Sequence, residues 1–147
     1  MELKGVQSGR CLEVIGPWQN PGDPADQDLT RTEIWDCTQA GKQIWTVIPL
    51  GDHKFSLKNQ QSGKRLDVYN GDPGNGIALT QFRCHGGASE QFVFPKGDNG
   101  SFAMQSVLTS RFTDVLLHGV DNGVTVGIYD RNNQSNQQWT AVQLTTA

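Results

Sequence analysis

The sequence predicts an all-β fold in which three similar repeats of about 47 residues follow one another. Two observations support this prediction: segments recur at a fixed offset, and the composition combines 17 Gly with only 18% charged residues. Such a composition suits many short strands joined by polar turns. Because 147 residues match the size of one typical domain, we expect residues 1–147 to form a single domain with repeats at approximately 1–50, 51–97 and 98–147.

The repeats are defined by matching segments and by an aromatic residue near the end of each repeat. The segments that match at an offset of 47 are 55–58 with 102–105, 66–68 with 113–115, and 75–76 with 122–123. The aromatic residues are Trp45, Phe92 and Trp139, again 47 apart. A period of this length indicates a repeat architecture. We expect the three aromatic side chains to lie in the core rather than at a binding surface.

Repeat one carries an insertion. Its segment 12–14 lies 54 residues before segment 66–68, so seven residues are additional. They fall in the Pro- and Asp-rich stretch 16–29, where a longer surface loop costs little because loop-closure entropy grows only logarithmically with length. Trp18 in this loop either extends a neighbouring pocket or packs onto the body of the domain.

Each repeat is expected to supply four short strands, which gives twelve in all. Segments 3–6, 55–58 and 102–105 have strand patterns, and the turns that follow them are Ser8-Gly9, Ser62-Gly63 and Thr109-Ser110. Asp-Asn-Gly at 98–100 and 121–123 predicts two hairpin turns, because Asn and Gly tolerate positive φ. No segment has the apolar period of a helix. Three units that cannot close a sheet alone favour a threefold barrel without open edges.

Charge and composition argue against several classes of function. The net charge is −3 and no basic residues cluster with aromatic ones, so we expect no nucleic-acid partner. No apolar run reaches the ~18 residues that span a bilayer, so we expect no membrane insertion. The first residues lack a signal-peptide pattern, so a secreted chain would have lost its signal or been excised from a longer protein. We expect no cofactor and no metal, because no phosphate loop and no zinc spacing is present.

The ordered motifs resemble the ricin B-type lectins and the related carbohydrate-binding modules of bacterial glycosidases, over the whole chain. This resemblance implies a β-trefoil fold with one possible sugar pocket in each repeat, a saccharide partner and a secreted protein. The segments that carry the resemblance are 8–14, 34–37 and 43–45 in repeat one; 62–68, 75–76, 82–84 and 90–92 in repeat two; and 112–115, 122–123, 128–130 and 136–139 in repeat three.

Repeat three matches the site pattern of the family best. A sugar site needs an ionised acceptor, neutral amides and one exposed aromatic face. The resemblance assigns these parts to Asp114 as the carboxylate that accepts from two hydroxyls, Tyr129 as the stacking aromatic, and Asn136 as the amide. Asn132 and Gln137 fall at supporting positions.

The other two repeats depart from the pattern. Repeat two keeps Asp67 and Phe82, and His85 matches a position that bonds the ligand in some family members, but the usual Asn-Gln pair is replaced by Ser89 and Glu90. In repeat one, Trp35 and Gln43 are retained, but Glu13 replaces the expected Asp and Lys42 the expected Asn. We expect Lys42 to neutralise Glu13 as an ion pair. Asp, Phe and Tyr at strand ends also occur simply as turn acceptors or half-buried strand residues.

The resemblance also pairs Cys11 with Cys37 in a disulfide, whose 27-residue loop would stabilise the fold by about 3–4 kcal/mol. A disulfide implies an oxidising compartment. Cys84 is then a free thiol, which we expect to be half-buried and not catalytic. We expect His53 and His118 on the surface.

We expect no enzymatic activity, because a glycosidase needs two carboxylates placed across a bond and each pocket position offers one. Glu33 in repeat one and Glu90 in repeat two are additional acids, so a catalytic pair of carboxylates stays an alternative in these two repeats. The expected function is binding of galactose-type or xylose- or arabinose-type glycans, by a targeting module joined to the catalytic domain of a secreted glycoside hydrolase. The alternatives are a free-standing lectin or toxin subunit, or a protein-binding or protease-inhibitor domain that uses loop 17–28.

Overall fold

The computed structural model describes residues 1–17 and 23–143. Within these ranges it contains the expected twelve strands, six short 3-10 helices and no α-helix. The strands are β1 (Glu2–Gly5), β2 (Cys11–Val14), β3 (Thr32–Trp35), β4 (Trp45–Gly51), β5 (Lys54–Asn59), β6 (Arg65–Val68), β7 (Leu79–Phe82), β8 (Phe92–Val93), β9 (Gln105–Ser106), β10 (Phe112–Val115), β11 (Val126–Tyr129) and β12 (Trp139–Val142). The helices are η1 (Pro24–Asp26), η2 (Gly41–Gln43), η3 (Tyr69–Gly71), η4 (Ala88–Glu90), η5 (Leu116–His118) and η6 (Ser135–Gln137).

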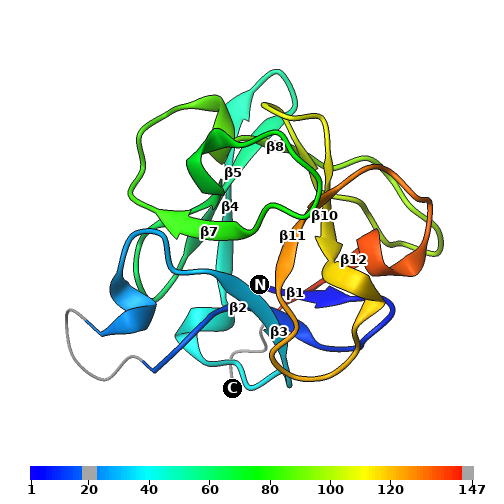
Figure 1. Cartoon of the computed structure of the whole chain (residues 1–147), viewed down its shortest axis with the longest axis horizontal. Helices are drawn as coiled ribbons and strands as arrows, with labels where there is room; N and C mark the ends of the chain where they lie inside the picture. Colours follow the sequence, from blue (N-terminus) through cyan, green and yellow to red (C-terminus); the bar gives the residue numbers. More distant parts are fainter. Residues whose placement is uncertain (18–22, 144–147) are drawn as a thin grey trace.

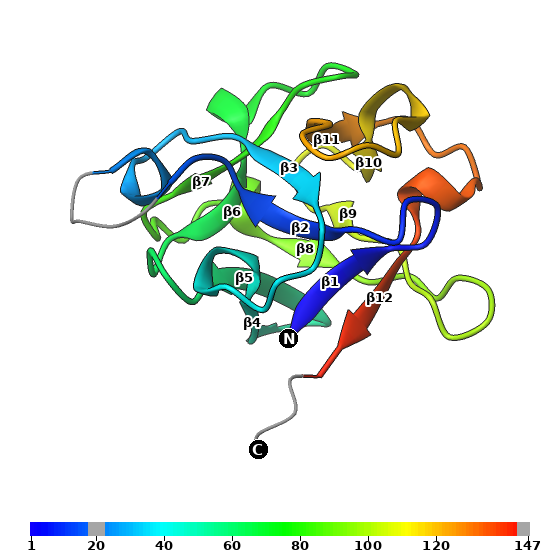
Figure 2. The same ribbon diagram turned by 90° about the horizontal axis from the view of Figure 1, so that it is seen from below.

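The hydrogen-bonded ladders form two open sheets, so the expectation of a barrel without open edges is wrong in detail. One sheet has the order β12-β1-β2-β3, and the other has the order β11-β10-β9-β8-β5-β6-β7 with β4 paired to β5. Besides the bridges between the hairpins described below, two short backbone contacts link the sheets: Met1 with Trp45, and Phe102 with Trp139. Because each contact spans one residue pair, neither extends into a ladder. Figure 2 shows β1 and β12 running together on the lower side of the molecule.

Three hairpins, β2-β3, β6-β7 and β10-β11, lie on the other side. Their outer strands β3, β7 and β11 approach one another (Figure 1). Isolated bridges join them in a triangle, at Arg31–Thr80, Glu33–Thr125 and Ala78–Gly127. Each repeat therefore contributes one hairpin to a threefold cap.

The core repeats with the sequence. Trp45, Phe92 and Trp139 are fully buried, which confirms their predicted place in the core. Equivalent apolar positions form two further layers: Leu3, Leu57 and Met104, and Val14, Val68 and Val115. Both tryptophans donate their indole N–H to a backbone carbonyl, so their burial leaves no polar group unpaired.

The predicted turns are confirmed, with one correction to the place of a turn and one to the length of a strand. In all three repeats the second turn residue has positive φ: Gly9 at 71°, Gly63 at 73° and Ser110 at 62°. The turn at 98–100 closes a hairpin between Lys96 and Phe102. The turn at 121–123 instead lies within the longer β10-β11 connection. The strand expected at 102–105 is reduced to the bridge at Phe102 and to β9, because the chain changes pairing partner from β12 to β8.

The Asn-Gly motif has a second role that the sequence did not indicate. Asn122 of repeat three accepts from the Asp36 N–H and the Arg10 side chain of repeat one, at 2.8 and 2.7 Å. Asn75 of repeat two contacts Arg111 and Asp130 of repeat three in the same way. The equivalent in repeat one is Asp28, which bonds Arg83 of repeat two through its N–H and its guanidinium. In this contact the negative charge of Asp28 is balanced by the positive charge of Arg83.

The insertion in repeat one is a loop, as expected, and the loop contains the short helix η1. Gln81, which takes the place of Ile34 and Ile128 in the core, donates to the carbonyls of Ala25 and Gln27 at 2.8 Å and so anchors the loop. Trp18 lies outside the described residues. No helix in the described ranges is long and apolar enough to cross a membrane.

Candidate functional site

The three repeats hold their predicted site residues on the same scaffold. The carboxylate comes from the first strand of the capping hairpin, the aromatic ring ends its second strand, and a 3-10 helix carries the next two side chains. The sets are Glu13, Trp35, Lys42 and Gln43 (site one); Asp67, Phe82, His85, Ser89 and Glu90 (site two); and Asp114, Tyr129, Asn132, Asn136 and Gln137 (site three). Shared hollows and hydrogen bonds bring together the members of sites two and three, and hydrogen bonds and an ion pair bring together Glu13, Lys42 and Gln43 of site one.

Site three is a hollow of about 380 Å³ lined by Asp114, Tyr129, Asn132 and Asn136. Tyr129, the last residue of β11, pairs with Phe112 at the open end of the β10-β11 hairpin and is 45% exposed, so its ring is accessible from solvent. Asp114 is only 3% exposed and its carboxylate lies at the base. The arrangement offers an anionic acceptor beneath an exposed aromatic face.

Hydrogen bonds fix the polar groups of site three. Gln137 Nε2 donates to Asp114 Oδ2 at 2.8 Å, and Gln137 Oε1 accepts from the Asn132 N–H at 3.0 Å. Asn132 Nδ2 donates to Asn136 Oδ1 at 3.0 Å. Burial raises the pKa of Asp114, while the bonds from Gln137 and Asn136 and the nearby His118 act against that rise. The carboxylate is thus oriented before any ligand arrives.

Part of the wall of site three comes from residues that were not among the predicted site residues. Leu117 and His118 of η5 line the hollow together with Gln134. Leu117 and His118 adopt positive φ, at 58° and 55°, which projects the segment outwards, and Leu117 is 97% exposed. His118 is exposed, as expected, and its side chain also lines the hollow of site three. The run of apolar residues before Gly119 gave no signal for such a turn.

Site two is a hollow of about 360 Å³ whose carboxylate is already occupied. His85 Nε2 lies 2.9 Å from Asp67 Oδ2, and the His85 and Phe82 rings meet edge to face at 5.9 Å between centroids. Ser89 Oγ is 3.4 Å from the same ring nitrogen. In site three the hydrogen bond to the carboxylate oxygen Oδ2 comes from Gln137 and not from a histidine.

The side chains of Asp67, His85 and Glu90 gather within 4.8 Å of one another, but their hydrogen bonds do not suit a metal. The Gly87 N–H donates to His85 Nδ1 at 2.9 Å, so in the neutral ring the proton lies on Nε2. A metal-binding imidazole needs a lone pair on the coordinating nitrogen and normally donates from the other one. The backbone here enforces the opposite arrangement.

Site one is neutralised internally. Lys42 Nζ lies 3.4 Å from Glu13 Oε2, which confirms the expected ion pair, and Gln43 Nε2 donates to Glu13 Oε1 at 3.0 Å. Glu33 pairs with Glu13 across the β2-β3 hairpin. Burial, then the hydrogen bond to Glu13 and its charge, raise the pKa of Glu33 to about 8, although Lys42 opposes the rise. Trp35 keeps an exposed ring at 40%.

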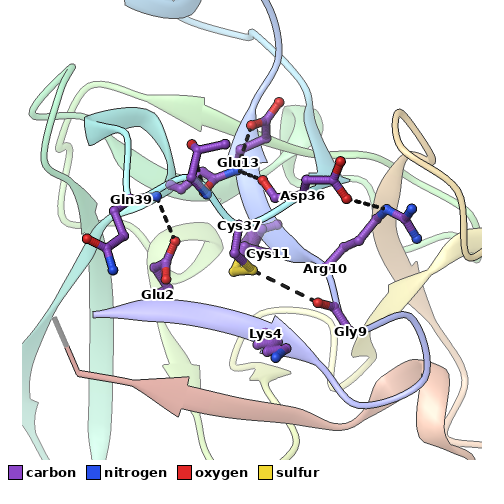
Figure 3. The surroundings of a disulfide bond; sticks show 12 residues. Glu2, Lys4, Gly9, Arg10, Cys11, Glu13, Asp36, Cys37 and Gln39 are labelled. Carbon is purple, nitrogen blue, oxygen red and sulfur yellow. Dashed lines mark hydrogen bonds and ion pairs between the residues drawn. A yellow bond between two sulfur atoms is a disulfide. The ribbon is translucent and has the colours of Figure 1, made fainter.

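Cys11 and Cys37 form the expected disulfide, which ties β2 to the segment after β3 (Figure 3). Arg10, next to Cys11, forms an ion pair with Asp36 at 3.3 Å. Cys84 is a free thiol among the described cysteines. It is exposed rather than half-buried, because it follows the end of β7 at Phe82.

Two buried acids make stability depend on pH. Burial is the main cause that raises the pKa of Glu33 to about 8 and of Glu90 to about 7. Since both values exceed the ordinary 4.5, the folded chain binds more protons than the unfolded chain between about pH 4.5 and 8. The resulting stabilisation is full below that window and is lost as pH rises through it. We expect a higher urea midpoint at about pH 5 than at about pH 8.5, and a smaller difference in Glu33→Gln. Equal midpoints in the unmodified chain would contradict this assignment.

The chain is similar to a family of lectin domains and to several proteins of known structure. A family model described as ricin-type beta-trefoil lectin domain-like matches residues 1–82. The designed threefold symmetric protein ThreeFoil superposes with a TM-score of 0.89 at 25% identity, covering 97% of each chain. An exo-beta-1,3-galactanase from Clostridium thermocellum gives 0.88 at 22% identity, covering 97% of this chain but 30% of the galactanase. The Rhizoctonia solani agglutinin gives 0.79 at 18% identity, covering 94% and 89%. All three share the β-trefoil arrangement described above.

Proposed function

The chain belongs to the ricin-type β-trefoil lectin domain-like family, and on this basis we propose that it is a non-catalytic carbohydrate-binding domain whose main site is site three. Residues 1–147 would act as one binding unit. The observation that carries the proposal is the meeting of Asp114, Tyr129 and Asn136 in one open hollow. The buried carboxylate would accept from two sugar hydroxyls, the ring would stack on the C–H face, and the amide would contact the same hydroxyl pair.

The three sites would differ in strength. In site two, a ligand must displace His85 from Asp67 or bond to it. In site one, Glu13 already receives bonds from Gln43 and Lys42, so few acceptor positions are left for hydroxyls. We therefore rank site three first, site two second and site one third.

A hydrolytic role has less support. A glycosidase separates its two carboxyl groups by roughly 5–9.5 Å, with the scissile bond between them. The carboxyl oxygens of Asp67 and Glu90 instead lie within 4.8 Å of each other, and Glu13 lies close enough to Glu33 to raise its pKa. No substrate oxygen fits between partners in such contact.

Two biological settings fit a binding domain, and both place it outside the cell, where the disulfide would persist. The match to part of a galactanase favours a targeting module of a secreted glycoside hydrolase. The match along most of an agglutinin favours a free-standing lectin. A free lectin with two active sites cross-links cells, whereas a module retains its enzyme on polysaccharide.

Calorimetric titration with galactose, lactose, arabinose and xylo-oligosaccharides tests the proposal. Such shallow sites bury few ligand atoms, so we expect a dissociation constant on the order of 0.1–1 mM for at least one sugar. Cellobiose serves as a control for non-specific binding. Absence of binding by all four classes, with the chain folded by circular dichroism, would contradict the proposal.

A further inference from the structure

Site two differs from the other two sites at one chemically decisive position. Gln43, Glu90 and Gln137 are equivalent, each at the end of its 3-10 helix. In sites one and three the amide Nε2 donates to the carboxylate of the site, Glu13 or Asp114, at 3.0 and 2.8 Å. In site two a carboxyl group stands where that amide would be.

One half of the Glu90 side chain reproduces the glutamine. Its Oε1 accepts from the His85 N–H at 3.0 Å, as Gln137 Oε1 accepts from the Asn132 N–H at 3.0 Å. The other oxygen, Oε2, replaces Nε2, the donor. It is buried, in a residue that is 2% exposed, and it accepts no hydrogen bond from any described residue. His85 Nε2 lies 3.4 Å from it but is closer to Asp67 Oδ2, at 2.9 Å. A buried oxygen in a donor's place, beside an acceptor, requires a proton.

The backbone shows where that proton lies. Because the Gly87 N–H donates to His85 Nδ1, the neutral His85 ring holds its proton on Nε2, 2.9 Å from Asp67 Oδ2. A second proton on this ring would break the bond from Gly87. Because Asp67 already accepts the Nε2 proton of His85 whereas Glu90 Oε2 has no donor, we assign the proton between the two acids to Glu90.

The elements packed against η4 are β6 and β9, together with the segment that precedes it. The charged or titratable residues of these elements are Arg65 and Asp67 of β6, and Cys84 and His85 of the preceding segment; β9 carries none. Cys84 lines a hollow that also contains Glu90. Of this group, Asp67 and His85 act on the charge of Glu90.

We propose that Glu90 in its acid form is the positioning residue of site two, so that carbohydrate binding there weakens as pH rises through neutrality while site three keeps its affinity. The protonated carboxyl donates to Asp67 as Gln137 donates to Asp114. Loss of the proton leaves two buried carboxylates in contact, which repel each other and draw His85 further over the site. This inference rests on the proposed function of site two.

The energetics agree with this direction. Burial is the first cause that raises the pKa of Glu90 to about 7, and Asp67 raises it further, while His85 acts against the rise. The acid form therefore predominates below about pH 7 and is lost above it. Linkage then allows at most a tenfold loss of affinity per pH unit above the midpoint.

The test uses the full chain with two readouts. In the sugar-free protein, carbon-13 NMR of the side-chain carboxyl of Glu90, identified by its absence in Glu90→Gln, should titrate near neutral pH. In Asp114→Ala, where site two is the stronger remaining site, the dissociation constants for lactose and for xylotriose should rise about tenfold or more between about pH 5.5 and 8.5 for whichever sugar binds.

Glu90→Gln in the Asp114→Ala background restores the amide, so its dissociation constants at the two pH values should agree. Glu2→Gln is the matched control, a buried acid outside the sites, and should retain the pH dependence. Titration of Glu90 at its ordinary acidic pH would overturn the inference without touching the proposed function. So would a pH dependence that survives Glu90→Gln. A neutral titration without binding of either sugar at any pH would instead remove carbohydrate binding from site two, and the gating with it.

Discussion

Replacing Asp114 with alanine should weaken carbohydrate binding at site three by at least about 30-fold, because about 2 kcal/mol or more is lost with a charged acceptor of two hydroxyl bonds. From a starting constant on the order of 0.1–1 mM, such a loss makes site three undetectable by calorimetry. The fold should survive, since Gln137 Nε2 still donates to the Asp130 carbonyl at 2.7 Å. Titration of the variant beside the unmodified chain gives the comparison.

Asp98→Ala is the matched control, because Asp98 is an exposed acid in the 96–102 hairpin outside the three sites. It should bind sugar as the unmodified chain does. Tyr129→Ala should also bind weakly, through loss of stacking on the exposed ring. Full binding by Asp114→Ala, with unchanged stoichiometry, would show that site three is not the main site.

Removing the disulfide should cost about 3–4 kcal/mol of unfolding free energy. Cys11 and Cys37 are 26 residues apart, and in the chain-entropy model a closed loop of this length restricts the unfolded chain by that amount. For a chain of 147 residues the melting temperature should fall by about 10 °C. Urea unfolding of the Cys11→Ser, Cys37→Ser double variant measures the change directly.

Cys84→Ser controls for the loss of a thiol, since Cys84 is free and exposed. It should unfold at the same urea concentration as the unmodified chain. Binding at site three should persist in the double variant below its unfolding midpoint, because the disulfide lies in repeat one. A double variant as stable as the control would mean that repeat one gains nothing from the bond.

The fold was largely predictable because the repeat is encoded locally. Each repeat carries its own turn residues and its own buried aromatic, so an offset of 47 predicts both the strands and the core layer of Trp45, Phe92 and Trp139. The disulfide and the Lys42–Glu13 ion pair were also confirmed. Binding of carbohydrate by the predicted residues stays a prediction.

What the sequence left hidden depends on contacts between segments. Glu33 contacts Glu13 only because the β2-β3 register pairs them across the hairpin. Asn122 reaches repeat one because the threefold packing places it beside Arg10. The shortness of β9, which has only two residues, likewise follows from a change of partner strand. None of these three features leaves a pattern among neighbouring residues of the sequence, so none could be predicted from it.

Nitrogen-15 NMR of the folded protein during a sugar titration measures the central claim most directly, because it shows which repeats respond. Because the three repeats share one fold but differ in their site residues, we expect the largest shifts at the side-chain amides of Asn132, Asn136 and Gln137. Shifts around His85 should be smaller, and Gln43 should not shift. Shifts confined to the loop at 17–28, or equal shifts in all three repeats, would contradict the account.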